Sequence, residues 1–211
     1  RGWSLVADVG IAVGQHTNVC LGKPCADPAL IPSMLNENGE FHSSRTFRDH
    51  FKRGEELIDF DEACIEIRAQ HDRFVEIVGR EPDYFEAHAV MSKNLNRAIS
   101  AVAQELGLKE QKASFDPAAV VHCGDTDLRM VMRSMEPGYE PKEAIMQTVR
   151  EMVDGETVVF VCHPGYLDRF ILENSSLTTD RTKEVDALID PELRAWLESQ
   201  SDLRLIDYRD L

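Results

Sequence analysis

The chain has 211 residues, a formal net charge of −15 and an apolar content of 43%. This length suffices for one sizeable core and predicts a single domain over residues 1–211. The acidic balance argues against nucleic acid or an anionic membrane as the partner, because both would repel the chain. No apolar run approaches the roughly 20 residues of a membrane span, no signal peptide heads the chain, and the five cysteines form no CxxC pair. We therefore expect a cytoplasmic protein with reduced thiols.

Strand-like and helix-like segments alternate along the chain. Gly10 to Val13 has the character of a strand end, and apolar residues at helical intervals predict a helix over 61–78 that ends at Gly79. The remaining predicted elements are a strand at 83–85, a helix at 95–106 capped by Gly107, a strand at 118–121, a helix at 141–153, a strand at 158–162, helices at 180–188 and 191–197, and a final strand at 203–208. This order predicts an α/β fold with a parallel sheet, either open or closed as a barrel.

Residues 24–60 interrupt the alternation. The stretch is punctuated by Pro24, Pro28, Pro32 and Gly39, and it is long for a plain connection. We therefore expect an irregular loop that covers the substrate.

Several histidines follow predicted strands. His16, His88 and His163 stand at three such ends, although more than seventy residues separate neighbouring members of the set. The carboxyl ends of parallel strands gather at one edge of a sheet, so these side chains can converge on a metal or acid–base site. Hydrogen-bonded structural histidines are the alternative, and spacing alone does not decide between the two. His122 also follows a strand, but it has no supporting context and is interpreted as structural.

Other chemistries lack their usual patterns. Ser175 and Ser176 have no nucleophile-elbow glycines around them, which argues against a serine hydrolase. Neither G-x-x-x-x-G-K-[ST] nor G-x-G-x-x-G occurs, so the usual nucleotide-binding loops are excluded.

Three stretches together resemble the YdjC/ChbG-like carbohydrate deacetylases. They are GQHTNVCLGKP at 14–24, REPDYFEAHAV at 80–90 and VCHPGYLD at 161–168. The helix between the first two carries Ala69, Gln70, Arg73 and Phe74, which is similar to the family's A-Q-x-x-R-F pattern. The order and spacing match over nearly the whole chain, including SSLTTDR at 175–181 and the terminal LRLIDYRDL.

The resemblance implies an irregular TIM-like (β/α) barrel of fewer than eight strands. It also implies a hydrolase that removes the N-acetyl group from a small carbohydrate such as a chitooligosaccharide. His16 and His88 match the family's ligands of a divalent metal ion, either Mg²⁺ or Zn²⁺, and His163 matches its general acid. A homodimer is left open.

Asn18 and Tyr166, which stand in the stretches that carry the resemblance, are expected to contact the substrate, as is Glu86. Glu86 stands two residues before His88 and so lies on the same side of an extended strand. It can orient a ligand or the substrate, and an ordinary salt bridge is the alternative.

Two departures from the family pattern bear on the site. Many members have an Asp-x-His-x-His strand end where this chain has EAHAV at 86–90, so substrate contacts can differ. The family also begins with a strand ending in an Asp-Asp pair, which supplies a third metal ligand and the general base, and no Asp-Asp dipeptide occurs in this sequence. We favour the interpretation that the chain omits the amino-terminal part of a normal enzyme. The alternative is a truncated relative, which would be a catalytically impaired glycan-binding or interaction protein on the same scaffold. A third possibility is a metal-dependent hydrolase that acts on another acyl or glycan bond.

Overall fold

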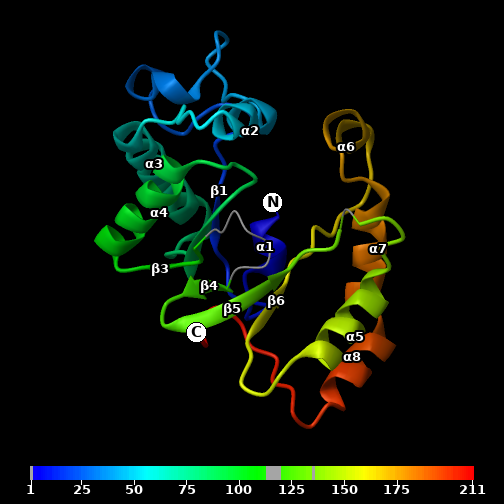
Figure 1. Ribbon diagram of the computed structural model, residues 1–211. Helices are drawn as coiled ribbons and strands as arrows, with labels where there is room; N and C mark the ends of the chain where they lie inside the picture. The colour runs from blue at the N-terminus through cyan, green and yellow to red at the C-terminus, as the bar shows by residue number, and fades with distance from the viewer. Residues whose placement is uncertain (1, 113–119, 135) are drawn as a thin grey trace. The chain divides into compact units, whose positions relative to one another are not determined.

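The computed structural model describes residues 2–112, 120–134 and 136–211 (Figure 1). The chain divides into two compact units, one formed by Arg1–Thr126 and Ile206–Leu211 and the other by Asp127–Leu205. Such a division does not decide between one domain and two, so the single domain over 1–211 stays a prediction. Within the described ranges, none of the helices combines the length and apolar character that crossing a membrane requires.

The first unit is organised around a three-stranded parallel sheet. Its order is β1 (Gln15–Thr17), β2 (Tyr84–Ala87) and β3 (Lys109–Glu110). The chain passes from β1 to β2 through α3 (Phe60–Val78) and from β2 to β3 through α4 (Lys93–Leu106), and the two helices pack against each other. The unit also holds α1 (Trp3–Val6) and β4 (Val120–Cys123). This strand–helix alternation confirms the predicted α/β class.

Local sequence accounts for the ends of both central helices. The Asp59 carboxylate accepts hydrogen bonds from the first amides of α3, and the Ser92 hydroxyl accepts from the Leu95 amide at the start of α4. Gly79 and Gly107 end these helices with φ angles of 79° and 67°, in the left-handed region that glycine adopts without strain. The two helices therefore begin and end within two residues of the predicted bounds. Their inward faces supply much of the core, which includes Ile67, Phe85, Leu95, Ile99 and Val102.

The stretch at 24–60 is more ordered than its prolines predict. It contains two short 3-10 helices, Pro28–Leu30 and Pro32–Met34, followed by α2 (Ser44–Lys52). Several of its apolar side chains are buried in the core of the first unit, among them Ile31, Met34, Phe41, Phe47 and Ile58. The stretch is therefore a packed part of this unit, and its role in covering a substrate stays a prediction.

The second unit contains the parallel pair β5 (Thr126–Val131) and β6 (Val158–Phe160). They are connected by α5 (Pro141–Glu151), which packs against α7 (Thr179–Leu188) and α8 (Pro191–Glu198). The short helix α6 (Arg169–Asn174) lies between β6 and α7 in the chain.

The strand predictions were less accurate than the helix predictions. The first strand is not at 10–13 but at Gln15–Thr17, so His16 lies within a strand instead of after it. The strand at 158–162 ends at Phe160. β5 was not predicted, although Asp127 and Arg129 alternate with apolar residues along it, which is a pattern typical of a strand. Of the strand expected at 118–121, the residues up to 119 lie outside the described residues, and β4 covers 120–123.

The predicted final strand at 203–208 was wrong, since the structure has no strand at those residues. The Tyr208 ring instead stacks on Tyr84, with 3.7 Å between the ring centroids and 12° between the planes. Leu205 and Ile206 are exposed, so the apolar pattern of this segment corresponds neither to strand pairing nor to burial. The strands that the structure describes form two small sheets, and their closure into a TIM-like barrel stays a prediction.

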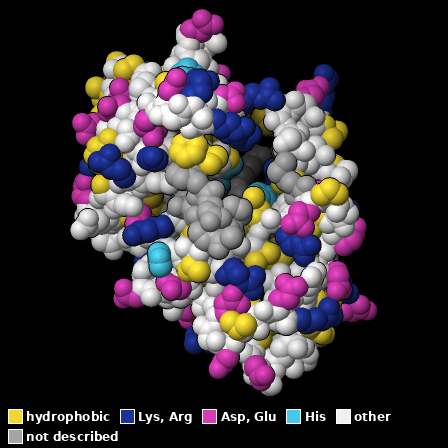
Figure 2. All heavy atoms as spheres, in the orientation of Figure 1, with side chains coloured by type: hydrophobic (Ala, Val, Ile, Leu, Met, Phe, Trp, Pro, Cys, Tyr) yellow, Lys and Arg dark blue, Asp and Glu magenta, His cyan; other side chains and the backbone are white. Residues whose placement is uncertain are grey.

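Charges of both signs share the surface. Figure 2 shows acidic and basic side chains interspersed over the visible face. On that face the net charge of −15 is therefore not gathered into one acidic patch.

Gly14 lies where the chain passes the ring of Tyr84. A Cβ added to Gly14 would stand 2.4 Å from Tyr84 Cζ, and the stacked Tyr208 ring lies 3.7 Å from the Tyr84 ring. We expect Gly14→Ala to lower the free energy of unfolding by about 1–3 kcal/mol, because overpacking forces neighbouring groups to move. Chemical denaturation would measure this change. Gly2→Ala is the control, since a Cβ there meets nothing within 4 Å. Equal denaturation midpoints for the two variants would contradict the prediction.

Candidate functional site

Three predicted site residues, His16, Glu86 and His88, lie together on one face of the first sheet. Gln15 and Thr17 are buried, so the alternation of side chains along β1 turns His16 to the opposite face. His16 lies opposite Glu86 in the β1–β2 register. The His88 amide donates to the Thr17 carbonyl at 3.0 Å, which extends the strand pairing past the end of β2 and brings the His88 ring beside His16.

Hydrogen bonds define the tautomer of the His16 ring, that is, which of its nitrogens carries the proton. Its Nδ1 lies 2.8 Å from Glu86 Oε1, and its Nε2 lies 2.7 Å from His88 Nδ1. An ionised carboxylate can only accept hydrogen bonds, so in the neutral imidazole the proton lies on Nδ1 and the lone pair on Nε2. A metal-binding histidine typically has this arrangement, with a carboxylate holding the nitrogen that does not bind the metal.

The chemistry of this cluster fits two ligands of a divalent metal ion. Two imidazole nitrogens that face each other at 2.7 Å would repel as bare lone pairs, so one nitrogen carries a proton that it donates to the other. A metal ion that both nitrogens bound would take the place of this proton. Imidazole suits zinc better than magnesium, which prefers oxygen ligands. Glu86 contacts Nδ1 of His16, on the other side of the ring from Nε2, and so is not a third donor where the two imidazoles meet. Among the residues that the structure describes, no group of three or more His, Cys, Asp or Glu side chains is placed to hold a metal.

Asn18, which was predicted to contact the substrate, shapes the loop after β1. Its Oδ1 accepts from the Cys20 amide at 3.1 Å, and its Nδ2 donates to the Leu21 carbonyl at 2.8 Å. These bonds close the turn that follows His16. Substrate binding by Asn18 stays a prediction.

Two residues of α3 that sequence reasoning did not single out for the site, Glu66 and Gln70, hold the same loop. Glu66 is fully buried and accepts from the amides of Cys25 and Ala26 at 3.0 and 2.9 Å. Gln70 lies one turn later and exchanges hydrogen bonds of 3.1 and 2.6 Å with the backbone of Asn18. A glutamate on the inward face of an amphipathic helix was the available signal, because a buried charge requires partners.

In the second unit, His163 follows β6 in a turn that α7 holds from two sides. The His163 amide donates to Glu184 Oε2 at 2.6 Å, and its carbonyl accepts from Arg181 Nη1 at 3.1 Å. The Gly165 amide donates to the Arg181 carbonyl at 3.2 Å. The backbone around His163 is therefore fixed by groups one helical turn apart on a single helix.

Glu184 is the centre of a buried polar network that the sequence did not indicate. The residue is fully buried, and its Oε1 accepts from Ser134 Oγ at 2.8 Å and from the Tyr139 hydroxyl at 3.0 Å. Burial, assisted by the nearby Glu184, raises the pKa of Tyr139, so the phenol remains a donor. Burial together with the Glu184 charge also raises the pKa of Cys162 to about 11, which keeps that thiol protonated near neutral pH.

Tyr166 lies three residues after His163 and is highly exposed, with 78% of its surface accessible. Its ring offers a flat apolar face to solvent. Contact with a substrate stays a prediction for this residue.

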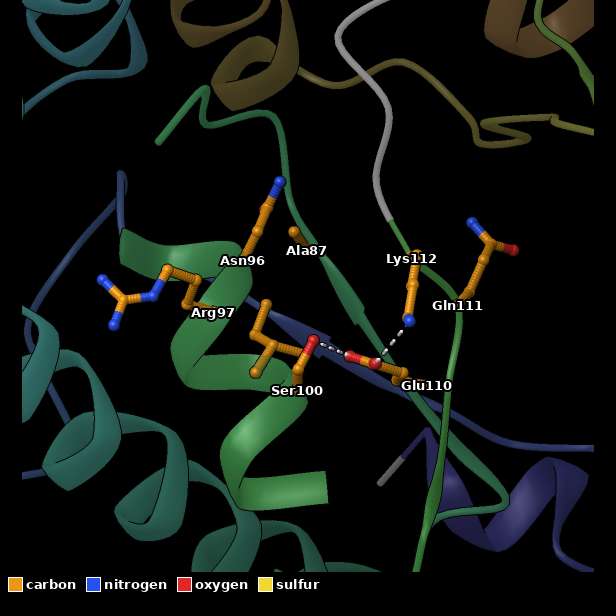
Figure 3. Close-up of a pocket in the computed structure, with 8 residues that line it drawn as sticks. Ala87, Asn96, Arg97, Ser100, Glu110, Gln111 and Lys112 are labelled. Atoms are coloured by element: carbon orange, nitrogen blue, oxygen red, sulfur yellow. Dashed lines mark hydrogen bonds and ion pairs between the residues drawn. The ribbon is translucent and has the colours of Figure 1, made fainter. Parts of the chain in front are cut away.

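A hollow of about 200 Å³ in the first unit contains none of the predicted site residues. Figure 3 shows Ala87, Asn96 and Ser100 on one side of it and Glu110 and Lys112 on the other. Glu110 accepts from the Ser100 hydroxyl at 2.6 Å. Side chains alternate along β2, so Ala87 points away from the face that carries Glu86 and His88. The hollow is therefore distinct from the histidine cluster.

Comparisons with known proteins agree over most of the chain. Residues 3–199 match the profile of a family described as YdjC-like protein. A protein of Listeria innocua serovar 6a named carbohydrate deacetylase 2 is 28% identical over 204 residues, which cover 95% of this chain and 77% of the relative. A protein of Serratia marcescens named chitooligosaccharide deacetylase is 28% identical over 215 residues, which cover 96% of this chain and 79% of the relative.

A solved structure shares the fold. It is a protein of Enterococcus faecalis V583 described as a cellobiose-phosphate cleavage protein, and it matches with a TM-score of 0.79. The match covers 99% of this chain and 81% of the other at 22% sequence identity. At this identity the likeness concerns the fold alone.

Proposed function

The chain belongs to the YdjC-like protein family, and on that premise we propose that it is a carbohydrate deacetylase that removes N-acetyl groups from chitooligosaccharide-type sugars. The observation that carries the proposal is the His16–Glu86–His88 cluster, in which a carboxylate holds one of two converging imidazoles in its ligand form. Relatives named as carbohydrate and chitooligosaccharide deacetylases support the substrate class. An irregular TIM-like barrel of fewer than eight strands is part of the same proposal.

The proposed reaction is hydrolysis of an acetamide. Water adds to the carbonyl carbon, the C–N bond breaks, and acetate and the free amino sugar are released. The nitrogen must gain a proton before it leaves, because an amide anion is a poor leaving group. We assign this proton to the imidazolium of His163, since histidine donates protons efficiently near neutral pH.

His16 and His88 are the residues that would hold a divalent metal, with zinc favoured by the two nitrogen donors. Such an ion supplies a water of lowered pKa and polarises the acetamide carbonyl. Glu86 keeps His16 in its ligand form through the 2.8 Å hydrogen bond to Nδ1. The exposed ring of Tyr166 provides an apolar face against which a sugar ring can pack.

The function is tested by incubating the purified protein with N,N′-diacetylchitobiose in the presence of Zn²⁺ or Mg²⁺. We expect equal molar amounts of acetate and of new primary amine, with faster release in Zn²⁺. Sugar binding in a calorimeter without acetate release in either metal would contradict the proposal.

That contrary result would favour a second function, a glycan-binding protein without turnover. One observation supports this alternative. The described residues offer two nitrogen donors at the cluster and no group of three metal-binding side chains. Acetate release would eliminate it.

A further inference from the structure

The proposed function uses the His163 imidazole and leaves the buried groups behind it without a role. Glu184 and Ser134 are both fully buried in the second unit. Burying a carboxylate is costly unless hydrogen bonds compensate, and here three donors surround it: the Ser134 hydroxyl, the Tyr139 hydroxyl and the His163 amide. One of these donors, Ser134, also contacts the His163 ring.

We propose that Glu184, acting through Ser134, is a positioning residue that keeps the His163 ring proton on Nδ1. This inference rests on the proposed role of His163 as the general acid. Ser134 and Glu184 lie outside the motifs that resemble the family, and the inference gives them the role of fixing which ring nitrogen of His163 carries the hydrogen.

The direction of the hydrogen bonds supports the assignment. The Ser134 hydroxyl has a single proton, and its 2.8 Å bond to Glu184 Oε1 uses that proton because a carboxylate has none to give. The Ser134 oxygen is then an acceptor towards His163 Nδ1, which lies 3.3 Å away. The chain of donors therefore runs from the imidazole through the hydroxyl to the carboxylate, and Nδ1 carries a hydrogen.

This order suits a general acid. The imidazolium has hydrogens on both nitrogens, and it becomes the Nδ1–H form when Nε2 gives up its proton. The neutral form favoured for histidine in water is the other one, with the hydrogen on Nε2. Ser134 and Glu184 therefore stabilise the ring that remains after proton transfer, in the way that a buried carboxylate holds the histidine of a catalytic triad.

Replacing Ser134 distinguishes this positioning role from a purely structural one. Glu184 also accepts the His163 amide at 2.6 Å, so its replacement would disturb the backbone as well as the ring. The Ser134 side chain is hydrogen-bonded to the His163 ring and to Glu184. Ser134→Ala thus removes the link to Nδ1 and keeps the bond between Glu184 and the backbone.

The test is ¹⁵N NMR of the His163 ring, combined with kinetics on N,N′-diacetylchitobiose. In the wild-type protein we expect the neutral ring to be mainly Nδ1–H, and in Ser134→Ala mainly Nε2–H. We expect kcat to fall about 10- to 100-fold in Ser134→Ala, with KM within about twofold, which is the loss seen when the hydrogen-bond partner of a metal-binding histidine is removed.

Two control variants distinguish the positioning of the His163 ring from a general disturbance of the surrounding structure. Tyr139→Phe deletes the other hydroxyl bound to Glu184 Oε1, and we expect its His163 ring to keep the Nδ1–H form. Asp186→Asn removes a carboxylate from an exposed position of the same helix and should leave kcat unchanged.

Two results would overturn the inference: a wild-type ring that is mainly Nε2–H, or an equal tautomer change in Tyr139→Phe and Ser134→Ala. The wild-type spectrum decides even where Ser134→Ala does not fold. If the wild-type protein releases no acetate, the proposed function is wrong. The NMR spectrum would still show which ring nitrogen of His163 carries the hydrogen, and so would still test the inference.

Discussion

Replacing His163 with alanine is expected to lower kcat for acetate release by about 10²- to 10⁴-fold, the usual contribution of a positioned general acid. The leaving nitrogen would then have to take its proton from water. The fold should survive, because Glu184 and Arg181 bond to the backbone of His163 and not to the atoms that the substitution removes. Steady-state kinetics on N,N′-diacetylchitobiose would give kcat, and thermal unfolding would confirm that the variant is folded.

His122→Ala is the matched control for this experiment. His122 is an exposed histidine on β4, and nothing places it in the proposed chemistry. Its variant should keep wild-type kcat. A folded His163→Ala protein with kcat within tenfold of wild type would rule out His163 as the proton donor.

Removing both imidazoles of the cluster is expected to abolish metal binding. In His16→Ala/His88→Ala the two converging nitrogens are lost, so bound Zn²⁺ should fall from near stoichiometric to background. Elemental analysis after equilibrium dialysis would measure it. Glu86→Gln keeps both nitrogens but loses the carboxylate that holds the Nδ1 proton of His16, and we expect metal affinity about 10- to 100-fold weaker.

The control for the metal experiment is His50→Ala/His122→Ala, which removes the same number of imidazoles elsewhere. His50 lies in α2 and not on the strands that carry the cluster, and it pairs with Glu55 at 2.9 Å. We expect its metal content to equal that of wild type. Equal metal content in the two double variants would show that His16 and His88 are not the ligands.

The helices of this protein were predictable because their signals are local. The bounds of α3 and α4 follow from a capping side chain at the start, an apolar stripe, and a glycine in the left-handed region at the end. Each of these features acts within a few residues. The three-residue strand β1 has no comparable signal, since its existence depends on pairing with β2 some seventy residues later. The alternation at 203–208 was misleading for the same reason, because a strand also needs a distant pairing partner, and of this segment it is the Tyr208 ring that stacks on the distant Tyr84.

For the candidate site, the sequence was sufficient to predict the residues but not the contacts between them. Resemblance to a family and the two-residue period of a strand sufficed to single out His16, Glu86, His88 and His163. The tertiary structure alone decided which atoms of the cluster meet, with Glu86 on Nδ1 of His16 and His88 on its Nε2.

The sequence by itself determined the α/β class, the central helices and the candidate residues, because propensity, capping and motif spacing are properties of short segments. Only the tertiary structure revealed Glu184 and Ser134 behind His163, from positions 21 and 29 residues away in the chain. Within its own helix Glu184 resembles any surface glutamate. Its burial and its three donors arise from α7 packing over the turn at His163, and no local pattern encodes that contact.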